Sequence, residues 1–157
     1  MTDKNLTHID AEGNAHMVDV SDRDVTTRTA TATGKVNLSA EVVAMLRDNS
    51  VPKGDVLATA RIAGIMGAKK TSELIPLCHP LAIHGVDVDL VTVSSGVEIT
   101  ATVKTVDRTG VEMEALTAVS VAGLTVIDMV KALDPGATIT DVGVEKKDGG
   151  RNGLWTR

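Results

Sequence analysis

Aromatic side chains are almost missing from this sequence of 157 residues, which has one tryptophan, no phenylalanine and no tyrosine. Sheets that bind single-stranded RNA stack the bases on aromatic side chains. The one ring of that kind, Trp155, lies near the C-terminus, so an RNA-binding sheet is strongly disfavoured. The hydrophobic core must be built from Val, Ile, Leu, Ala and Met instead.

Cysteine is just as scarce. Cys78 is the only one, so the chain cannot form an internal disulfide bond. The N-terminus has no apolar segment of the kind found in signal peptides, and no span of about 18 residues is apolar and free of charge. We therefore expect a cytoplasmic protein with no membrane partner.

Patterns typical of metal and nucleotide sites are also missing. The histidines show none of the close spacings typical of metal ligands, and there is no second cysteine to join them. No glycine pattern of a phosphate-binding or dinucleotide-binding loop occurs. We expect no bound metal. The histidines are His8, His16, His79 and His84.

Charge is unevenly distributed along the chain, whose formal net charge is −5. Residues 1–24 carry six acidic residues against Lys4 and Arg23, and the remainder is close to neutral. A near-neutral body lacks the broad basic surface of a protein that binds duplex nucleic acid. We expect residues 1–24 to form an acidic arm, flexible or ordered on binding, and residues 25–157 to form one domain that carries the site.

Hydrophobic periodicity predicts a strand, two helices, two strands, a long helix and a last strand. This order is typical of an α+β protein, a ferredoxin-like βαββαβ two-layer sandwich with an extra helix. Two prolines predict a stiff extended ribbon over residues 75–80. We expect residues 146–157 to be a glycine-rich basic tail. The predicted strands and helices are residues 25–38, 40–49, 56–67, 86–90, 97–103, 111–134 and 139–144.

The long helix predicted at residues 111–134 is apolar on nearly every side. In a two-layer domain only one helix face meets the sheet, so the other should meet a second subunit. Small residues would allow close approach between subunits, and we expect an obligate homo-oligomer. These small residues are Ala115, Ala118, Ala122 and Gly123.

Asp128 and Lys131 lie three residues apart on this helix, so they share a face and can contact each other. A buried acid–amine pair is either a structural ion pair at an oligomer interface or catalytic machinery, in which the acid keeps the lysine usable for proton transfer. Lys53 immediately precedes the N-terminus of the helix at 56–67, where the macrodipole lowers the pKa of an ammonium group. The alternative for Lys53 is an ordinary exposed lysine in a turn.

Two further segments could contact a ligand. Cys78 and His79 are neighbours in an extended ribbon, where side chains alternate in direction, so we reject a thiol–imidazole dyad. We expect Cys78 to be a small buried residue and His79 to face a ligand. Residues 148–153 read Asp-Gly-Gly-Arg-Asn-Gly, which could wrap a phosphate with backbone N–H groups and Arg151, or could be a solvated tail.

Seven short motifs, occurring in order over residues 6–153, resemble those of one known family. They are Leu6-Thr-His-Ile-Asp10, Ala15-His-Met-Val-Asp-Val-Ser21, Lys53-Gly-Asp-Val56, Ala58-Thr-Ala-Arg-Ile-Ala-Gly64, Ile75-Pro-Leu-Cys-His-Pro80, Thr109-Gly-Val-Glu-Met-Glu-Ala-Leu-Thr117 and Asp128-Met-Val-Lys131. In these motifs the chain resembles the cyclic pyranopterin monophosphate synthase family, MoaC, of molybdenum cofactor biosynthesis.

The resemblance implies an enzyme, a lyase that converts 3′,8-cyclo-7,8-dihydroguanosine 5′-triphosphate to cyclic pyranopterin monophosphate and diphosphate. It implies that Asp128, Lys53 and Lys131 are catalytic, the two lysines as an acid/base pair. It also implies a homo-hexamer, a trimer of dimers, with active sites at subunit interfaces. No cofactor is required, although Mg²⁺ could accompany the substrate triphosphate.

The same resemblance, together with the chemistry of pyrophosphate release, suggests the substrate-binding residues. They are Leu77, Cys78, His79, Met113, Glu114, Arg28, His16, Lys69, Lys147 and Arg151. The family commonly has Gly-Gly-Lys-Ser-Gly where this chain has arginine and asparagine at residues 151 and 152. Arginine can hold a phosphate but cannot act as a base, so a role in proton transfer at Arg151 is in doubt.

A different class of function fits the same fold. An oligomeric domain that binds a phosphorylated metabolite between subunits, without catalysis, would share its architecture. Such a domain would tolerate changes at Lys53, Asp128 and Lys131 without losing ligand binding.

Overall fold

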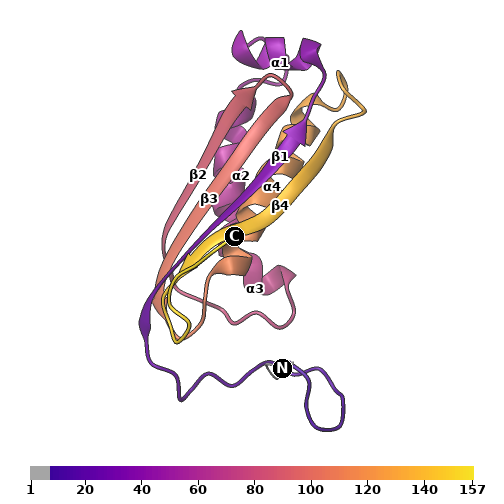
Figure 1. Cartoon of the computed structure of the whole chain (residues 1–157). Helices are drawn as coiled ribbons and strands as arrows, with labels where there is room; N and C mark the ends of the chain where they lie inside the picture. The colour runs from indigo at the N-terminus through magenta and orange to yellow at the C-terminus, as the bar shows by residue number, and fades with distance from the viewer. Residues whose placement is uncertain (1–7) are drawn as a thin grey trace.

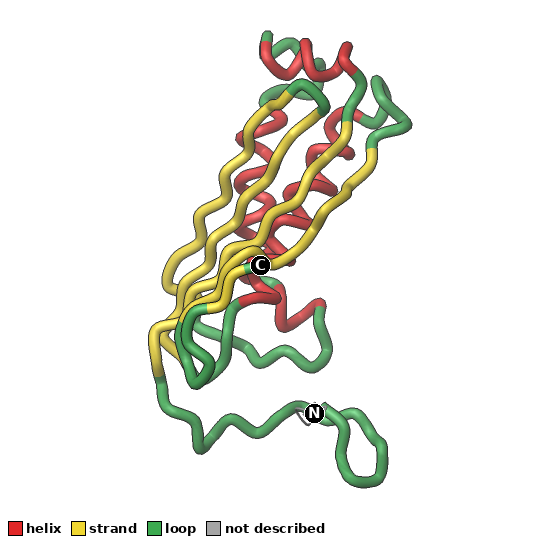
Figure 2. Tube along the Cα trace, viewed as in Figure 1, coloured by secondary structure: helices red, strands yellow, loops and turns green. Residues whose placement is uncertain are grey.

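Five antiparallel strands form one sheet in the order β2-β3-β1-β4-β5 in the computed structural model, which describes residues 8–157. Helices α2 and α4 lie side by side on one face of this sheet (Figures 1 and 2). The predicted two-layer α+β sandwich is therefore confirmed. The elements are β1 Thr26–Asn37, α1 Ala40–Arg47, α2 Val56–Lys69, α3 Thr71–Leu74, β2 Ile83–Val93, β3 Gly96–Asp107, α4 Glu112–Val130, β4 Thr138–Asp148 and β5 Trp155–Thr156.

Small residues on central strand β1 bring helix α4 close to the sheet. Ala30 and Ala32 are fully buried, and alternate residues of the strand point outward, as the pleat requires. A Cβ atom at Gly34 would lie 2.5 Å from Cγ1 of Val119 on α4. The small residues on the inner face of β1 thus set the spacing between the sheet and α4.

The small residues of α4 serve the protomer itself, which corrects the expectation that they face a second subunit. Ala115, Ala118 and Ala122 are fully buried within one chain. A Cβ atom at Gly64 of α2 would lie 3.0 Å from the carbonyl oxygen of Ala118, so these residues let the two helices pack closely. The helix also ends at Val130 rather than at residue 134.

Larger apolar residues remain on the outer surface of the helix layer. Leu124 of α4 and Ile62 and Met66 of α2 are each about 60% exposed. Among residues 8–157, α4 is the one helix long and apolar enough to span a bilayer, yet half of that stretch is buried inside the protomer. Its apolar character therefore serves first as part of the core.

The C-terminal segment is not a free tail, contrary to the prediction. Residues 146–148 belong to β4, and β5 returns to pair with it, Trp155 opposite Lys147. Arg157 donates to the carbonyl oxygen of Val144 and forms an ion pair with Glu145 at 3.4 Å. These contacts hold the loop at 149–154 against the end of the sheet.

The predicted extended ribbon begins instead with a turn. Pro76 and Leu77 lie in that turn, and the amide of Cys78 donates to the carbonyl oxygen of Ile75 at 3.1 Å. Regular extended structure is absent from residues 75–77, so side chains there need not alternate in direction.

Residues 8–24 form an irregular arm that runs beyond the end of the domain opposite to α1 (Figure 1). Two side chains attach it to the domain: Nε2 of His79 lies 2.8 Å from the carbonyl oxygen of Val18, and Arg108 donates to two carbonyl oxygens of the arm. Residues 1–7 of the predicted arm, including Leu6 and Thr7 of the first motif, lie outside the described residues.

Candidate active site

Lys53, Asp128 and Lys131, the three residues expected to be catalytic, meet at the C-terminal end of α4. The ammonium group of Lys131 donates to Oδ1 of Asp128 at 2.7 Å. Nζ of Lys53 donates to the carbonyl oxygen of Asp128 at 2.6 Å and lies 3.6 Å from Oδ2. One carboxylate is thus held between two ammonium groups.

The turn before α2 delivers Lys53 to this cluster. Gly54 adopts a φ of 103°, which glycine tolerates far better than other residues. The side chain of Asp55 then accepts a hydrogen bond from the amide of Ala58 and caps the helix. Because the start of α2 packs near the end of α4, the lysine reaches Asp128.

The cluster is open to solvent within one protomer, contrary to the expectation of a buried pair. The side chains of Asp128 and Lys131 are each 60% exposed, because α4 ends at Val130 and leaves its last turn uncovered. The hydrogen bond and charge of Lys131, with the charge of Lys53, lower the pKa of Asp128 below its ordinary value. Asp128 is therefore an ionised acceptor at neutral pH.

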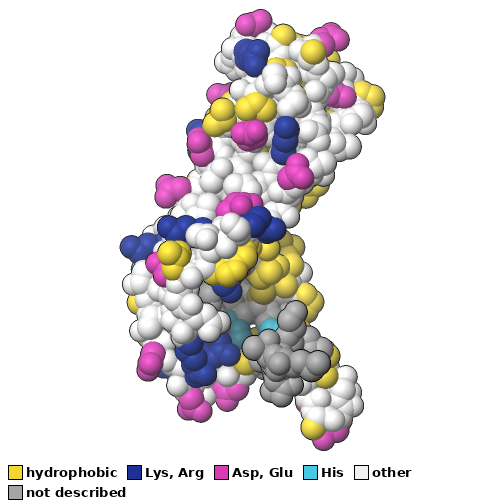
Figure 3. Space-filling view, viewed as in Figure 1, with side chains coloured by type: hydrophobic (Ala, Val, Ile, Leu, Met, Phe, Trp, Pro, Cys, Tyr) yellow, Lys and Arg dark blue, Asp and Glu magenta, His cyan; other side chains and the backbone are white. Residues whose placement is uncertain are grey.

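A cavity of about 360 Å³ lies at the other end of α4. Its walls include Cys78, His79, Met113 and Glu114, all of them expected substrate-binding residues, and Val18 of the arm. Figure 3 shows histidine side chains within a hollow on this part of the surface, with lysine and arginine side chains nearby. Cys78 and His79 both line this cavity, although the sequence predicted that Cys78 would be buried and that His79 would face a ligand.

Burial controls the acid and the thiol in this cavity. Glu114 is only 4% exposed, and desolvation, with the nearby charge of Glu112, raises the pKa of its carboxyl group. Desolvation and the charge of Glu114 also raise the pKa of the Cys78 thiol. A raised pKa disfavours the thiolate, which agrees with the rejection of a thiol–imidazole dyad.

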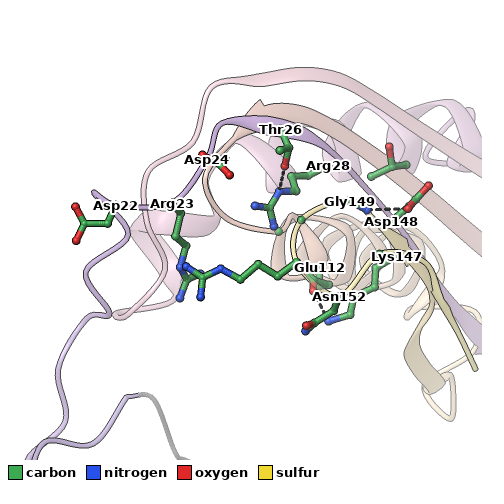
Figure 4. Close-up of a pocket in the computed structure, with 15 residues that line it drawn as sticks. Asp22, Arg23, Asp24, Thr26, Arg28, Glu112, Lys147, Asp148, Gly149 and Asn152 are labelled. Carbon is green, nitrogen blue, oxygen red and sulfur yellow. Dashed lines mark hydrogen bonds and ion pairs between the residues drawn. The ribbon is translucent and has the colours of Figure 1, made fainter.

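A second cavity, of about 570 Å³, adjoins the first. The two share Arg23, Gly110 and Glu112 in their walls. Basic side chains from the arm, from β1, from β4 and from the C-terminal loop surround the second cavity (Figure 4). These basic residues are Arg23, Arg28, Lys147 and Arg151.

Contacts within this second cavity fix two of its cations. Lys147 forms an ion pair with Glu112 at 2.9 Å. Nε of Arg28 donates to Oγ1 of Thr26 at 2.7 Å. A Cβ atom at Gly150 would lie 2.2 Å from Nη1 of Arg28, so the glycine lets the guanidinium group lie directly against the loop.

Three of the expected binding residues lie elsewhere. His16 of the arm, Leu77 in the turn and Lys69 at the end of α2 line neither cavity. Arg23 lines both cavities, but it was counted only as a charge of the arm, because its contacts depend on tertiary structure. The spacing of residues along the chain carries no signal for it.

The cluster and the cavities occupy opposite ends of one helix. Glu114 and Asp128 are 14 residues apart on α4, which corresponds to about 21 Å along the axis. Direct proton transfer requires atoms within hydrogen-bond reach, and this separation is several times longer. The cluster and the cavities are therefore two separate regions of one chain.

No metal centre occurs in the part of the chain that the structure describes. Over residues 8–157, no group of three or more His, Cys, Asp or Glu side chains is placed to hold an ion.

The sequence model of the MoaC family matches residues 17–150 of this chain. A protein named cyclic pyranopterin monophosphate synthase from Streptomyces coelicolor is 68% identical over 97% of this chain and 89% of its own length. The protein named cyclic pyranopterin monophosphate synthase 2 from Mycobacterium tuberculosis is 61% identical over 97% of this chain and 91% of its own length. A protein named cyclic pyranopterin monophosphate synthase from Dinoroseobacter shibae is 60% identical over 96% of this chain and 96% of its own length. The chain belongs to the MoaC family.

Proposed function

We propose that this chain is a cyclic pyranopterin monophosphate synthase of molybdenum cofactor biosynthesis, a lyase that releases diphosphate. Its substrate is 3′,8-cyclo-7,8-dihydroguanosine 5′-triphosphate. The observation that carries the proposal is the cluster of Lys53, Asp128 and Lys131, with 2.6 to 3.6 Å between its charged and polar atoms. The names of the relatives, at 60–68% identity over nearly the whole chain, support the same reaction.

The two adjoining cavities suit the two parts of such a substrate. The smaller cavity, with His79 and the buried Glu114, offers polar groups for the ring system derived from guanine. The larger cavity, with Arg28 and Lys147, offers cations for the triphosphate, since guanidinium and ammonium groups form strong charge-assisted hydrogen bonds to phosphate. Lys69 lies outside both cavities and is not assigned to the phosphates.

Proton transfer is the task of the lysine cluster. Rearranging the imidazole ring into a pterin moves protons among nitrogen and oxygen atoms, and each step assisted by a positioned acid or base gains roughly 10²–10⁴-fold in rate. Lys53 and Lys131 form the acid/base pair. Asp128 accepts from Lys131 and orients it, and does not itself attack the substrate.

Closure of the cyclic phosphate is the step that releases diphosphate. A hydroxyl oxygen of the sugar-derived part attacks the α-phosphorus, and the bond from that phosphorus to the oxygen bridging to the β-phosphorus breaks. The departing diphosphate takes the electron pair, and the proton of the hydroxyl passes to a base. Cations around the larger cavity stabilise the charge on the leaving group.

Two subunits must combine to complete each active site. The cluster of one protomer and the cavities of another form one site, because about 21 Å of helix separates them within a chain. The exposed Leu124, Ile62 and Met66 support a subunit interface on the helix layer. We propose a hexamer, a trimer of dimers, in the cytoplasm. It needs no resident cofactor, and any Mg²⁺ would arrive on the triphosphate.

A single-turnover assay with the cyclised GTP derivative tests the proposal. It follows diphosphate release and pterin product together for the wild-type protein, Lys53→Ala and Asp128→Ala. We expect both products from the wild type. Each variant should lose at least about 10²-fold in rate, with its oligomeric state unchanged in sedimentation.

Binding without diphosphate release from the wild-type protein would overturn the enzyme assignment. That result would favour the non-catalytic domain that binds a phosphorylated metabolite. In that case Lys53→Ala and Asp128→Ala would bind the substrate as tightly as the wild type does.

A further inference from the structure

We propose that Arg23 binds the phosphates of the substrate in the larger cavity, and that Arg108 is its positioning residue. Arg108 acts by holding the backbone of the arm on which Arg23 lies. The inference rests on the proposed function for the identity of the ligand. The contacts below carry it for these two arginines.

Of the lysine and arginine residues among residues 8–157, only Arg23 lines both cavities. It is part-buried although it belongs to an otherwise exposed stretch of the arm. Figure 4 shows the side chains of Arg23 and Arg28 entering the same space, one from the arm and the other from β1. Arg23 therefore lies at the junction between the proposed ring pocket and the proposed phosphate pocket.

The charge of Arg23 is available to a ligand. Lys147 in the same cavity is already paired with Glu112 at 2.9 Å. Among residues 8–157, no carboxylate lies within ion-pair distance of the Arg23 guanidinium group. A planar guanidinium group can bind two phosphate oxygens at once, which suits a group placed beside a triphosphate.

Arg108 attaches the arm at this point. Its Nη1 donates to the carbonyl oxygen of Ser21 at 2.5 Å and also to that of Arg23. Arg108 directly follows β3, which ends at Asp107, so its backbone is fixed by the sheet. The backbone of Arg23 is thereby tied to a rigid element.

The same residue also reaches the second arginine of the cavity. The carbonyl oxygen of Arg108 accepts a hydrogen bond from Nη2 of Arg28 at 3.2 Å. Arg108 thus ties the backbone of Arg23 and the guanidinium group of Arg28 to the same point at the end of β3. Holding charged groups in place before the ligand arrives reduces the entropy lost on binding.

Titration with inorganic pyrophosphate, the proposed product, tests the proposal without requiring turnover. The variants are Arg23→Gln, Arg108→Gln and the double variant, measured by calorimetry on the full chain. Arg23→Gln should weaken binding roughly 10- to 100-fold, as expected for a lost hydrogen bond to a charged group. Arg108→Gln should weaken it less. The double variant should match Arg23→Gln alone, because Arg108 acts through Arg23.

A matched control and a conservative variant separate positioning from general damage. Arg61 of α2 donates to the carbonyl oxygen of Val88 and pairs with Asp89, away from both cavities, so Arg61→Gln should leave pyrophosphate binding unchanged. Arg108→Lys keeps a donor for one carbonyl and should recover part of the affinity lost in Arg108→Gln. In the single-turnover assay, the concentration of substrate at half-maximal rate should rise in Arg23→Gln, with a smaller change in maximal rate.

Two results would overturn the inference. Unchanged pyrophosphate affinity in Arg23→Gln would remove Arg23 from the phosphate site. Additive losses in the double variant would show that Arg108 does not act through Arg23. Failure of the wild type to turn over, with pyrophosphate binding still dependent on Arg23, would overturn the proposed function and support this inference.

Discussion

Glu114 carries a carboxyl group into the core at the start of α4, with 4% of its surface exposed. Burial raises its pKa above the ordinary value of 4.5, because the ionised form is disfavoured away from water. Because the pKa is raised in the folded state, the contribution of Glu114 to the free energy of unfolding is most favourable below about pH 4.5. This contribution falls as the pH rises through the folded pKa. The ionised Glu114 side chain thus lowers the free energy of unfolding of the protein as the pH rises.

Glu114→Gln should be more stable than the wild type at about pH 8, and the difference should shrink as the pH falls toward about 5. The amide keeps the shape of the side chain but cannot ionise. Urea unfolding at a fixed protomer concentration measures the free energy at each pH. Glu98→Gln, a change at an exposed position on β3, should show no such trend, and parallel pH profiles for the two variants would contradict the explanation.

Sequence spacing predicted one contact of the candidate site and could not have predicted others. Asp128 and Lys131 are three apart on a helix, so their hydrogen bond follows from local geometry. Lys53 reaches them only because α2 packs beside α4. The sequence singled it out for its place before a helix N-terminus and through the family resemblance, and neither predicted its contact with Asp128. Arg23 lies 85 residues from Arg108, which holds its carbonyl oxygen, and no local pattern reports such a contact.

At the scale of elements, the close approach of β1 and α4 depends on the missing side chain of Gly34. An added Cβ atom would lie 2.5 Å from Cγ1 of Val119 and 3.2 Å from Cγ2 of Val142. Both neighbours are stiff β-branched residues, and Val119 is fully buried. Val142 is 41% exposed, so Val119 is the neighbour that has little room to move.

Gly34→Ala should lower the free energy of unfolding by about 1–3 kcal/mol through overpacking. Gly85→Ala on β2 is the matched control, because a Cβ atom there meets nothing within 4 Å and the backbone φ is ordinary. We expect that control to stay within about 0.5 kcal/mol of the wild type. The denaturant midpoints of Gly34→Ala, Gly85→Ala and the wild type measure this difference. Equal midpoints for Gly34→Ala and the wild type would mean that β1 and α4 can move apart without a loss of stability.

The order and type of the main elements were predictable because their hydrophobic periods are clear, whereas their ends were not. Alternation at residues 97–103 predicted β3, which in fact runs over Gly96–Asp107. The small residues of α4 were predicted to contact another subunit, but Ala118 and Ala122 pack against Gly64 of α2, and Gly123 lies against Ile139 of β4. Periodicity shows that a face is buried and does not show which partner buries it.

At the scale of the molecule, about 21 Å of α4 separates the cluster of Lys53, Asp128 and Lys131 from the cavities, which we propose to be completed by another subunit. Mixing Asp128→Ala with Glu114→Ala should therefore restore activity if the active site is shared. In a two-fold symmetric dimer that exchanges subunits at random, about a quarter of the sites would be intact. The single-turnover assay measures the recovered rate.

The control for this experiment is a mixture of Asp128→Ala with Lys131→Ala. Both changes affect the same cluster, so no pairing of subunits creates an intact site and the mixture should stay inactive. Recovery in neither mixture, with subunit exchange demonstrated by mass, would argue that each chain works alone.

The scarcity of aromatic residues makes one of them a natural reporter. Trp155 is the only intrinsic fluorophore of any strength in the chain, and it is 42% exposed in a two-residue strand paired opposite Lys147. Its emission is therefore insensitive to the aliphatic core and reports on the C-terminal strand beside the larger cavity. Unfolding curves measured by tryptophan fluorescence therefore follow the detachment of that strand. The protein thus carries an intrinsic fluorescent probe next to the proposed phosphate site.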